Sequence, residues 1–115
     1  MAKIHFDICV GVPAAVQFTA DEKDGVITLK WKEPENNGAA ITKYSVYQRF
    51  VNDKEWKKLE DITDTSKLNY DLIGEEGEEY EFVVTATNKY GESSKTRNIQ
   101  KIKMLEGKFN VKGVK

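Results

Sequence analysis

The alternation of apolar and polar residues along the chain predicts short β-strands. The clearest segment is residues 80–86, in which Tyr80, Phe82, Val84 and Ala86 occupy every second position. Successive side chains of a strand point to opposite faces, so this spacing favours a strand with one face in a core. No stretch of useful length has apolar residues at helical spacing. The pattern therefore predicts an all-β chain.

Glycine, proline and asparagine separate the alternating segments. The Asp24-Gly25 pair is typical of a tight turn between two strands. Pro34 ends the second of them, because proline has no N–H to donate to a ladder. We expect the Asn37-Gly38 pair to lie in a longer connection that crosses to a second sheet, with a tight hairpin as the alternative. The predicted strands are residues 16–20, 26–31, 44–50, 56–59, 68–72, 80–86 and 94–102.

Seven short strands within 115 residues predict one domain of the immunoglobulin-like β-sandwich class, built from two antiparallel sheets. Its charges nearly cancel, with 18 Lys and Arg against 19 Asp and Glu. This balance gives no general attraction to nucleic acid or to an anionic membrane surface. No apolar run approaches the roughly 20 residues of a membrane-spanning helix. We therefore expect neither a nucleic-acid partner nor membrane insertion of this domain.

The residue types that catalysis needs are scarce. Cys9 is the only cysteine and His5 the only histidine, and both lie in a terminal stretch. The chain has no Gly-x-Ser-x-Gly elbow and no phosphate-binding glycine loop. The acidic residues 75–79 lack the spacing of a calcium loop and are interpreted as a solvated connection. We expect no enzyme activity, no cofactor and no metal, and one cysteine excludes an internal disulfide.

Three parts of the chain together resemble the fibronectin type III domain. Residues 29–34 (Leu-x-Trp, then Pro) resemble its second strand with the core tryptophan, and residues 41–46 (Ile-x-x-Tyr-x-Val) resemble its third. Residues 77–93 (Gly-x-x-Tyr-x-Phe-x-Val-x-Ala-x-Asn-x-x-Gly-x-Ser) are similar to its sixth strand, with the corner tyrosine at Tyr80. The resemblance implies the seven-stranded topology of that family. We expect the domain at residues 12–102, with tails or linkers at 1–11 and 103–115.

The chain departs from the family six residues before the corner tyrosine. The family commonly has a leucine there, and this chain has Gly74. We expect Leu72 or Ile73 to fill the space. The core is predicted to contain the aromatic residues Trp31, Tyr44, Tyr70, Tyr80 and Phe82.

A candidate protein-binding surface lies on the face opposite the core. Tyr47 and Arg49 alternate with the predicted core residues of their strand, and Trp56 follows across the next turn. Exposed Tyr, Arg and Trp on neighbouring strands are the composition of a binding hot spot. The alternative is that Trp56 merely caps the edge of the sandwich.

The resemblance implies a non-catalytic protein–protein interaction module of a multidomain cell-surface receptor or adhesion protein. The alternative is a structural spacer module of an intracellular filament or scaffold protein. Partners are expected to be another protein or neighbouring modules of the same chain, with this domain monomeric. The family favours an extracellular location, but the lone cysteine and the missing Asn-x-Ser/Thr acceptor leave an intracellular one open. The tails, at residues 4–10 and 109–111, each have the pattern of an extra strand.

Overall fold

The computed structural model describes residues 10–104, so nearly all of the two extra strands predicted in the tails lies outside the described residues. The described chain contains eight strands and no helix. They are β1 (Phe18–Lys23), β2 (Val26–Trp31), β3 (Lys43–Phe50), β4 (Lys57–Ile62), β5 (Asn69–Ile73), β6 (Glu79–Asn88), β7 (Gly91–Glu92) and β8 (Gln100–Lys103).

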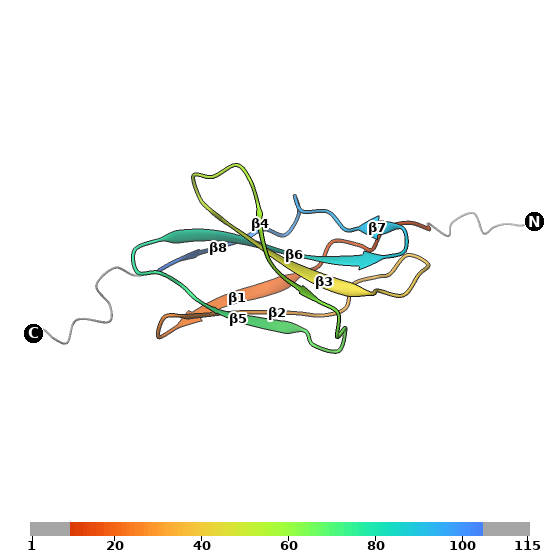
Figure 1. Cartoon of the computed structure of the whole chain (residues 1–115), viewed down its shortest axis with the longest axis horizontal. Coiled ribbons are helices and arrows are strands. Elements are labelled where there is room, and N and C mark those ends of the chain that lie inside the picture. The colour runs from red at the N-terminus through yellow and green to blue at the C-terminus, as the bar shows by residue number, and fades with distance from the viewer. Residues whose placement is uncertain (1–9, 105–115) are drawn as a thin grey trace, which may run out of the picture.

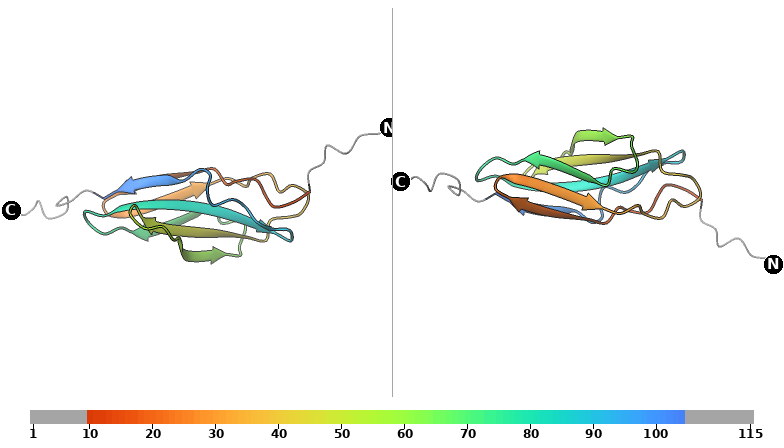
Figure 2. Two further views of the ribbon diagram at one scale, coloured as in Figure 1. Left: turned by 90° about the horizontal axis from the view of Figure 1, so that it is seen from above. Right: turned by 90° about the horizontal axis from the view of Figure 1, so that it is seen from below.

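The strands form two antiparallel sheets packed face to face, which confirms the predicted all-β sandwich (Figure 1). One sheet has the order β1-β2-β5. The other has the order β4-β3-β6-β7, and β8 also pairs with β6. Figure 2 shows the molecule from both sides, with β6 in front in one view and β1 and β2 in front in the other. The second sheet is called the β3–β6 sheet below.

The turn residues act as the pattern predicted. Asp24 and Gly25 both have positive φ, 52° and 88°, and join β1 to β2 in a two-residue turn. The connection after Pro34 crosses from one sheet to the other, as expected. Asn37 and Gly38 also have positive φ, but they turn the chain within that longer connection.

Only the end of the last predicted strand, residues 94–102, is a strand in the structure: it belongs to β8, and the short β7 comes before the predicted range. The Ser93 N–H donates to the Ala86 carbonyl (2.8 Å), and the Ala86 N–H donates to the Ser93 hydroxyl (2.9 Å). A side chain therefore occupies the place of the next backbone acceptor, and the chain leaves the sheet there. It returns at Gln100, after Asn98 takes a positive φ of 60° and donates through Nδ2 to the Val16 carbonyl. Hence eight strands are formed where seven were predicted.

The core lies between the sheets and contains the predicted aromatic residues. Trp31, Tyr44, Tyr80 and Phe82 are buried, whereas Tyr70 is half-buried against the core. The rings of Trp31 and Tyr44 lie 5.6 Å apart. Burial of such side chains contributes roughly 1.5–3 kcal/mol each. The Tyr80 hydroxyl accepts a hydrogen bond from the Glu75 N–H (2.9 Å), as a corner tyrosine does.

The expectation that Leu72 or Ile73 fills the space beside Gly74 is wrong, because Met104 fills it. A Cβ placed on Gly74 would lie 2.6 Å from the Met104 Sδ and 3.0 Å from the Ile27 Cδ1. Met104 is fully buried, whereas Ile73 is 80% exposed. Since β8 ends at Lys103 and the Met104 N–H donates to the Glu78 carbonyl (2.8 Å), the first two residues of the predicted C-terminal tail belong to the sandwich.

Candidate functional site

The predicted binding residues Tyr47, Arg49 and Trp56 lie on the outer side of the β3–β6 sheet or beside it, but they do not form one exposed surface. Tyr47 is only 6% exposed, so the expectation that it is exposed is wrong. The ammonium groups of Lys58 and Lys95 lie 5.8 and 4.7 Å from its ring centre. Long lysine side chains cover apolar surface while their charges stay in water, and strand alternation alone does not reveal such a cover.

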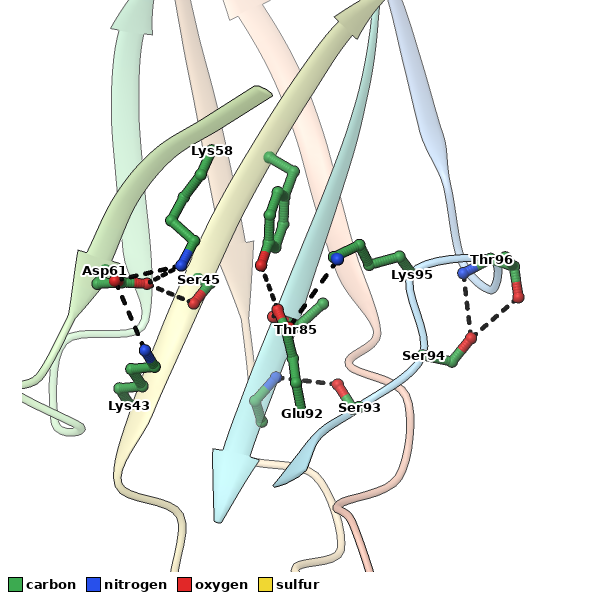
Figure 3. A network of polar contacts seen from close by, with 12 residues as sticks. Lys43, Ser45, Lys58, Asp61, Thr85, Glu92, Ser93, Ser94, Lys95 and Thr96 are labelled. Atoms are coloured by element: carbon green, nitrogen blue, oxygen red, sulfur yellow. Dashed lines mark hydrogen bonds and ion pairs between the residues drawn. The ribbon is translucent and has the colours of Figure 1, made fainter. Parts of the chain in front are cut away.

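Glu92 holds the polar part of this face together. Its carboxylate accepts hydrogen bonds from the Tyr47 hydroxyl and from the Thr85 hydroxyl (2.6 Å), and the Lys95 Nζ lies 3.9 Å away. Figure 3 shows Thr85 and Lys95 converging on it from β6 and from the segment after β7. Burial alone would raise the pKa of Glu92, but these donors and the charges of Lys95 and Lys58 outweigh it, so the pKa lies below its usual value.

Burial, followed by the hydrogen bond to Glu92 and that carboxylate's charge, raises the pKa of the Tyr47 phenol. The phenol therefore stays neutral and continues to donate at physiological pH.

A second polar group lies where β3 meets β4. The Asp61 carboxylate accepts from the Ser45 hydroxyl (2.6 Å) and lies 3.3 Å from the Lys58 Nζ and 3.6 Å from the Lys43 Nζ (Figure 3). The hydrogen bond from Ser45 is the main reason why the pKa of Asp61 is lowered. These carboxylates have donors and cations assigned to them, so they pin strands together rather than offer a paired acid and base.

Arg49 and Trp56 form the part of the face that remains reachable. The Arg49 guanidinium lies 4.1 Å from the centre of the Trp56 ring, and its Nε donates to the Glu81 carboxylate at 2.7 Å. Trp56 is half-buried and is not among the partly buried side chains packed on the core of the described chain. Its ring lies against the Arg49 guanidinium, at the turn before β4. A guanidinium fixed by an ion pair and an aromatic ring presents a planar, desolvated cation at little entropic cost.

Sequence reasoning missed a second site, at the end of the sandwich where the described chain begins. Asn88 is buried, and its Nδ2 donates to the Gly11 carbonyl (2.9 Å) and to the Asn36 carbonyl (2.8 Å). Its Oδ1 accepts from the Tyr90 N–H (2.8 Å). One amide thus joins three segments that are far apart in sequence. From the sequence, Asn88 was interpreted as a turn residue. The only signal for a further role was its place in the motif of residues 77–93 that resembles the fibronectin type III domain.

Two further hydrogen bonds fix the beginning of the chain at this end. The Gly11 N–H donates to the Asn37 carbonyl (3.0 Å), and the Asn37 Nδ2 donates to the Val12 carbonyl (2.9 Å). Residues 10–12, 36–38 and 88–91 together are called the N-terminal pole below. Gly11, predicted to be in a tail, is therefore held by the domain.

An open groove of about 730 Å³ lies between residues 14–19 and 30–35. The two segments are joined at one end by the pairing of Phe18 with Trp31 and at the other by the Ala14 N–H donating to the Glu35 carbonyl (2.9 Å). Its walls include Thr19 from one segment and Lys30, Lys32 and Glu33 from the other. Within residues 10–104 no group of three or more His, Cys, Asp or Glu is arranged to hold a metal ion, and no helix suited to crossing a membrane occurs.

Comparison with known proteins agrees with this geometry. Residues 11–102 match the fibronectin type III domain. Over 83 residues the chain is 34% identical to a titin homolog of Caenorhabditis elegans, a match that covers 70% of this chain and 0% of that very long protein to the nearest per cent.

Solved structures of multidomain proteins contain similar modules. The twitchin kinase region of C. elegans matches 84% of this chain and 17% of its own, with a TM-score of 0.65 and 21% identity. Domains FN1–FN3 of chicken CNTN1 match 83% of this chain and 33% of their own, with a TM-score of 0.63 and 24% identity. Domains A168–A170 of titin match 85% of this chain and 33% of their own, with a TM-score of 0.61 and 23% identity. The chain thus spans a small part of each of these relatives. It belongs to the fibronectin type III family, whose members are generally non-catalytic modules of multidomain proteins.

Proposed function

We propose that this module is a structural spacer of an intracellular filament or scaffold protein. The observation that carries the proposal is the 34% identity over 83 residues with the titin homolog. The matched segment makes up less than 1% of the length of that protein. In so long a chain, we infer that a small folded segment acts chiefly by setting length and holding shape. The lone cysteine and the absence of a sugar acceptor in the sequence are consistent with this function.

The path of the chain supports a load-bearing function. The described chain begins at the N-terminal pole, and its other end, Met104, lies beside Gly74 and Glu78 at the opposite end of the sandwich (Figure 1). A pull on the two ends therefore acts along the strands. The hydrogen bonds of β1 with β2 and of β8 with β6 are then loaded together, in shear, rather than opened one at a time.

Single-molecule pulling tests this function. The chain is placed between reference modules, and we expect one cooperative unfolding event that lengthens the tether by roughly 300 Å, as about 95 residues become extended. A spacer resists at a force comparable to that of the reference modules. Extension without a force peak contradicts the proposal.

Protein recognition is the second candidate function, favoured by the guanidinium of Arg49 held over Trp56. On this hypothesis the isolated domain binds a protein partner saturably, and Trp56→Ala weakens the binding several-fold because the ring and the orientation of Arg49 are lost together. Lys57→Ala, at the neighbouring exposed position, is the matched control. If affinity is unchanged in Trp56→Ala, this face is not the binding surface.

A further inference from the structure

The N-terminal pole contains Asn37-Gly38, the one Asn-Gly pair of the sequence. Asparagine is a thermolabile residue, and it loses its side-chain amide most readily when glycine follows. The reason is that glycine has no Cβ to shield the backbone nitrogen that attacks the asparagine side chain. Every other asparagine of the sequence is followed by a residue with a Cβ. Asn37 is only half-buried and Gly38 is exposed, so water reaches this peptide unit.

The loss of the amide needs no co-reactant except water. The Gly38 backbone nitrogen forms a bond to the Asn37 Cγ, the bond from Cγ to Nδ2 breaks, and Nδ2 leaves as ammonia with the proton of the Gly38 amide. Water then opens the five-membered ring that results. Opening at Cγ gives aspartate, and opening at the backbone carbonyl carbon gives isoaspartate, in which the main chain runs through the former side chain. Both products carry a negative charge that asparagine lacks.

In the folded domain, hydrogen bonds hold both groups that would have to react. The Gly38 N–H, which must lose its proton, donates to the Asn36 Oδ1 (3.0 Å). The Asn37 Nδ2, which must leave, donates to the Val12 carbonyl (2.9 Å). Both residues of the pair also have positive φ, 53° and 110°, and Val10 packs against the glycine. The closed pole therefore occupies the nucleophile and the leaving group at the same time.

We propose that Asn37 is a modification site that the closed N-terminal pole masks, and that it is converted to aspartate or isoaspartate when this pole opens. The opening separates residues 10–12 from residues 36–38 and leaves the two sheets paired. Segments held by a few hydrogen bonds outside the sheets open at a lower free energy than the core. The inference rests on the geometry of this pole and does not depend on the spacer function.

The modification would prevent the pole from closing as before. An aspartate at position 37 has no N–H for the Val12 carbonyl, and its charge repels that oxygen. In isoaspartate the Asn37 carbonyl, which accepts from the Gly11 N–H (3.0 Å), becomes a carboxylate beside the main chain. The hydrogen bonds of Asn88 use other atoms and remain. The domain thus stays folded, but its first segment is held less firmly.

Timed incubation of the full chain tests the masking. Peptide mapping by mass spectrometry measures the fraction of aspartate and isoaspartate at position 37, first in buffer and then in enough denaturant to unfold the chain. We expect conversion in buffer to be slower by about tenfold or more, because even one protecting hydrogen bond shifts a local equilibrium by roughly that factor.

Two variants distinguish opening of the pole from unfolding of the domain. Asn88→Ala removes a donor from two carbonyls of the pole, so conversion in buffer should be faster by about tenfold or more. Met104→Ala, at the opposite end of the sandwich, is the matched control and should leave the rate within about twofold. All chains should react at one rate in denaturant. Asn36→Ala, which frees only the Gly38 N–H, should also speed conversion, and it keeps the other hydrogen bonds of the pole.

Asn37→Asp supplies one product directly and tests the effect on the pole. Its Gly11 N–H should exchange with solvent about tenfold faster than in the natural chain, as measured by NMR, while the amides of β3 and β6 keep their protection.

Any one of three results overturns the inference. The first is equal conversion in buffer and in denaturant, and the second is equal acceleration by Asn88→Ala and Met104→Ala. The third is unchanged exchange of the Gly11 N–H in Asn37→Asp. None of these measurements depends on the force at which the module unfolds, so the spacer function is tested separately.

Discussion

At the scale of single residues, Asn88 does more for the domain than its place in a turn suggests. Its two amide hydrogens and its oxygen are all used, and each partner belongs to a different segment. A buried donor or acceptor left without a partner costs about 1–3 kcal/mol. The N-terminal pole is therefore held together largely by one side chain.

Asn88→Ala should lower the free energy of unfolding by about 2–4 kcal/mol, because the Gly11 and Asn36 carbonyls lose their donor. Denaturant titration of the two chains measures this. Asn69→Ala, on the exposed side of β5, is the matched control and should change stability by less than about 0.5 kcal/mol. Equal stability of the two variants would show that Asn88 does not hold the pole.

Glu92 makes stability depend on pH in a defined direction. Its folded pKa is lowered, so the folded state binds this proton less readily than the unfolded state. The resulting stability is present above the unfolded pKa, roughly 4.3, and is lost as pH falls through the lower folded value. We expect Glu92→Gln to be less stable than the natural chain at pH 7 and to lose less stability between pH 6 and pH 3. Parallel slopes in the two titrations would count against this role for the carboxylate.

How well the sequence predicts the burial of a residue depends on where its neighbours come from. Strand alternation placed Trp31, Tyr44 and Phe82 in the core because the core is a property of one face of each strand. It also placed Tyr47 opposite the core, but not beneath Lys58 and Lys95, because these come from other segments. Exposure depends on the neighbours of a residue, and these are known only once the strands are paired.

At the scale of elements, the best predictions concern strands bounded by strong turn residues. The strand 26–31 begins after Asp24-Gly25 and occupies the predicted residues as β2. The predicted strand 94–102 had no such boundary, and after the hydrogen bond from the Ala86 N–H to Ser93 the chain stays off the sheet until Gln100. A side chain that replaces a backbone acceptor is a tertiary event, so apolar alternation does not reveal it.

Gly74 and Met104 are a matched pair of positions. Met104→Ala should leave a cavity and cost about 2–5 kcal/mol, and Gly74→Leu should overpack and cost about 1–3 kcal/mol. In the double variant, the leucine side chain at position 74 should fill the space that Met104 leaves. The double variant should therefore be more stable than Met104→Ala. Thermal and denaturant unfolding of all four chains gives the coupling. Additive losses would mean that the leucine does not reach the space that Met104 leaves.

At the scale of the whole molecule, the fold was predictable and the function of its surfaces was not. Period-two strands, turn residues and one tryptophan determine a two-layer sandwich, because few other arrangements bury one face of so many strands. Which surface meets a partner depends on the side chains that remain exposed after folding. Here alternation accounts for the exposure of Val26 and Ile73, but not for that of Val10, Val12 and Tyr90, which lie outside the strands.

The position of Met104 has a consequence for a module under tension. The residue that seals the core beside Ile27 is also the last residue that the structure describes. Among the core residues of the described chain, Met104 is the first that a load on the C-terminal side reaches, and the four register pairs of β8 with β6 come next. Its withdrawal would empty the space beside Gly74 and separate β8 from β6. The contact of Met104 with the core would thus be the first to break under load, and the module would begin to unfold from its C-terminal end.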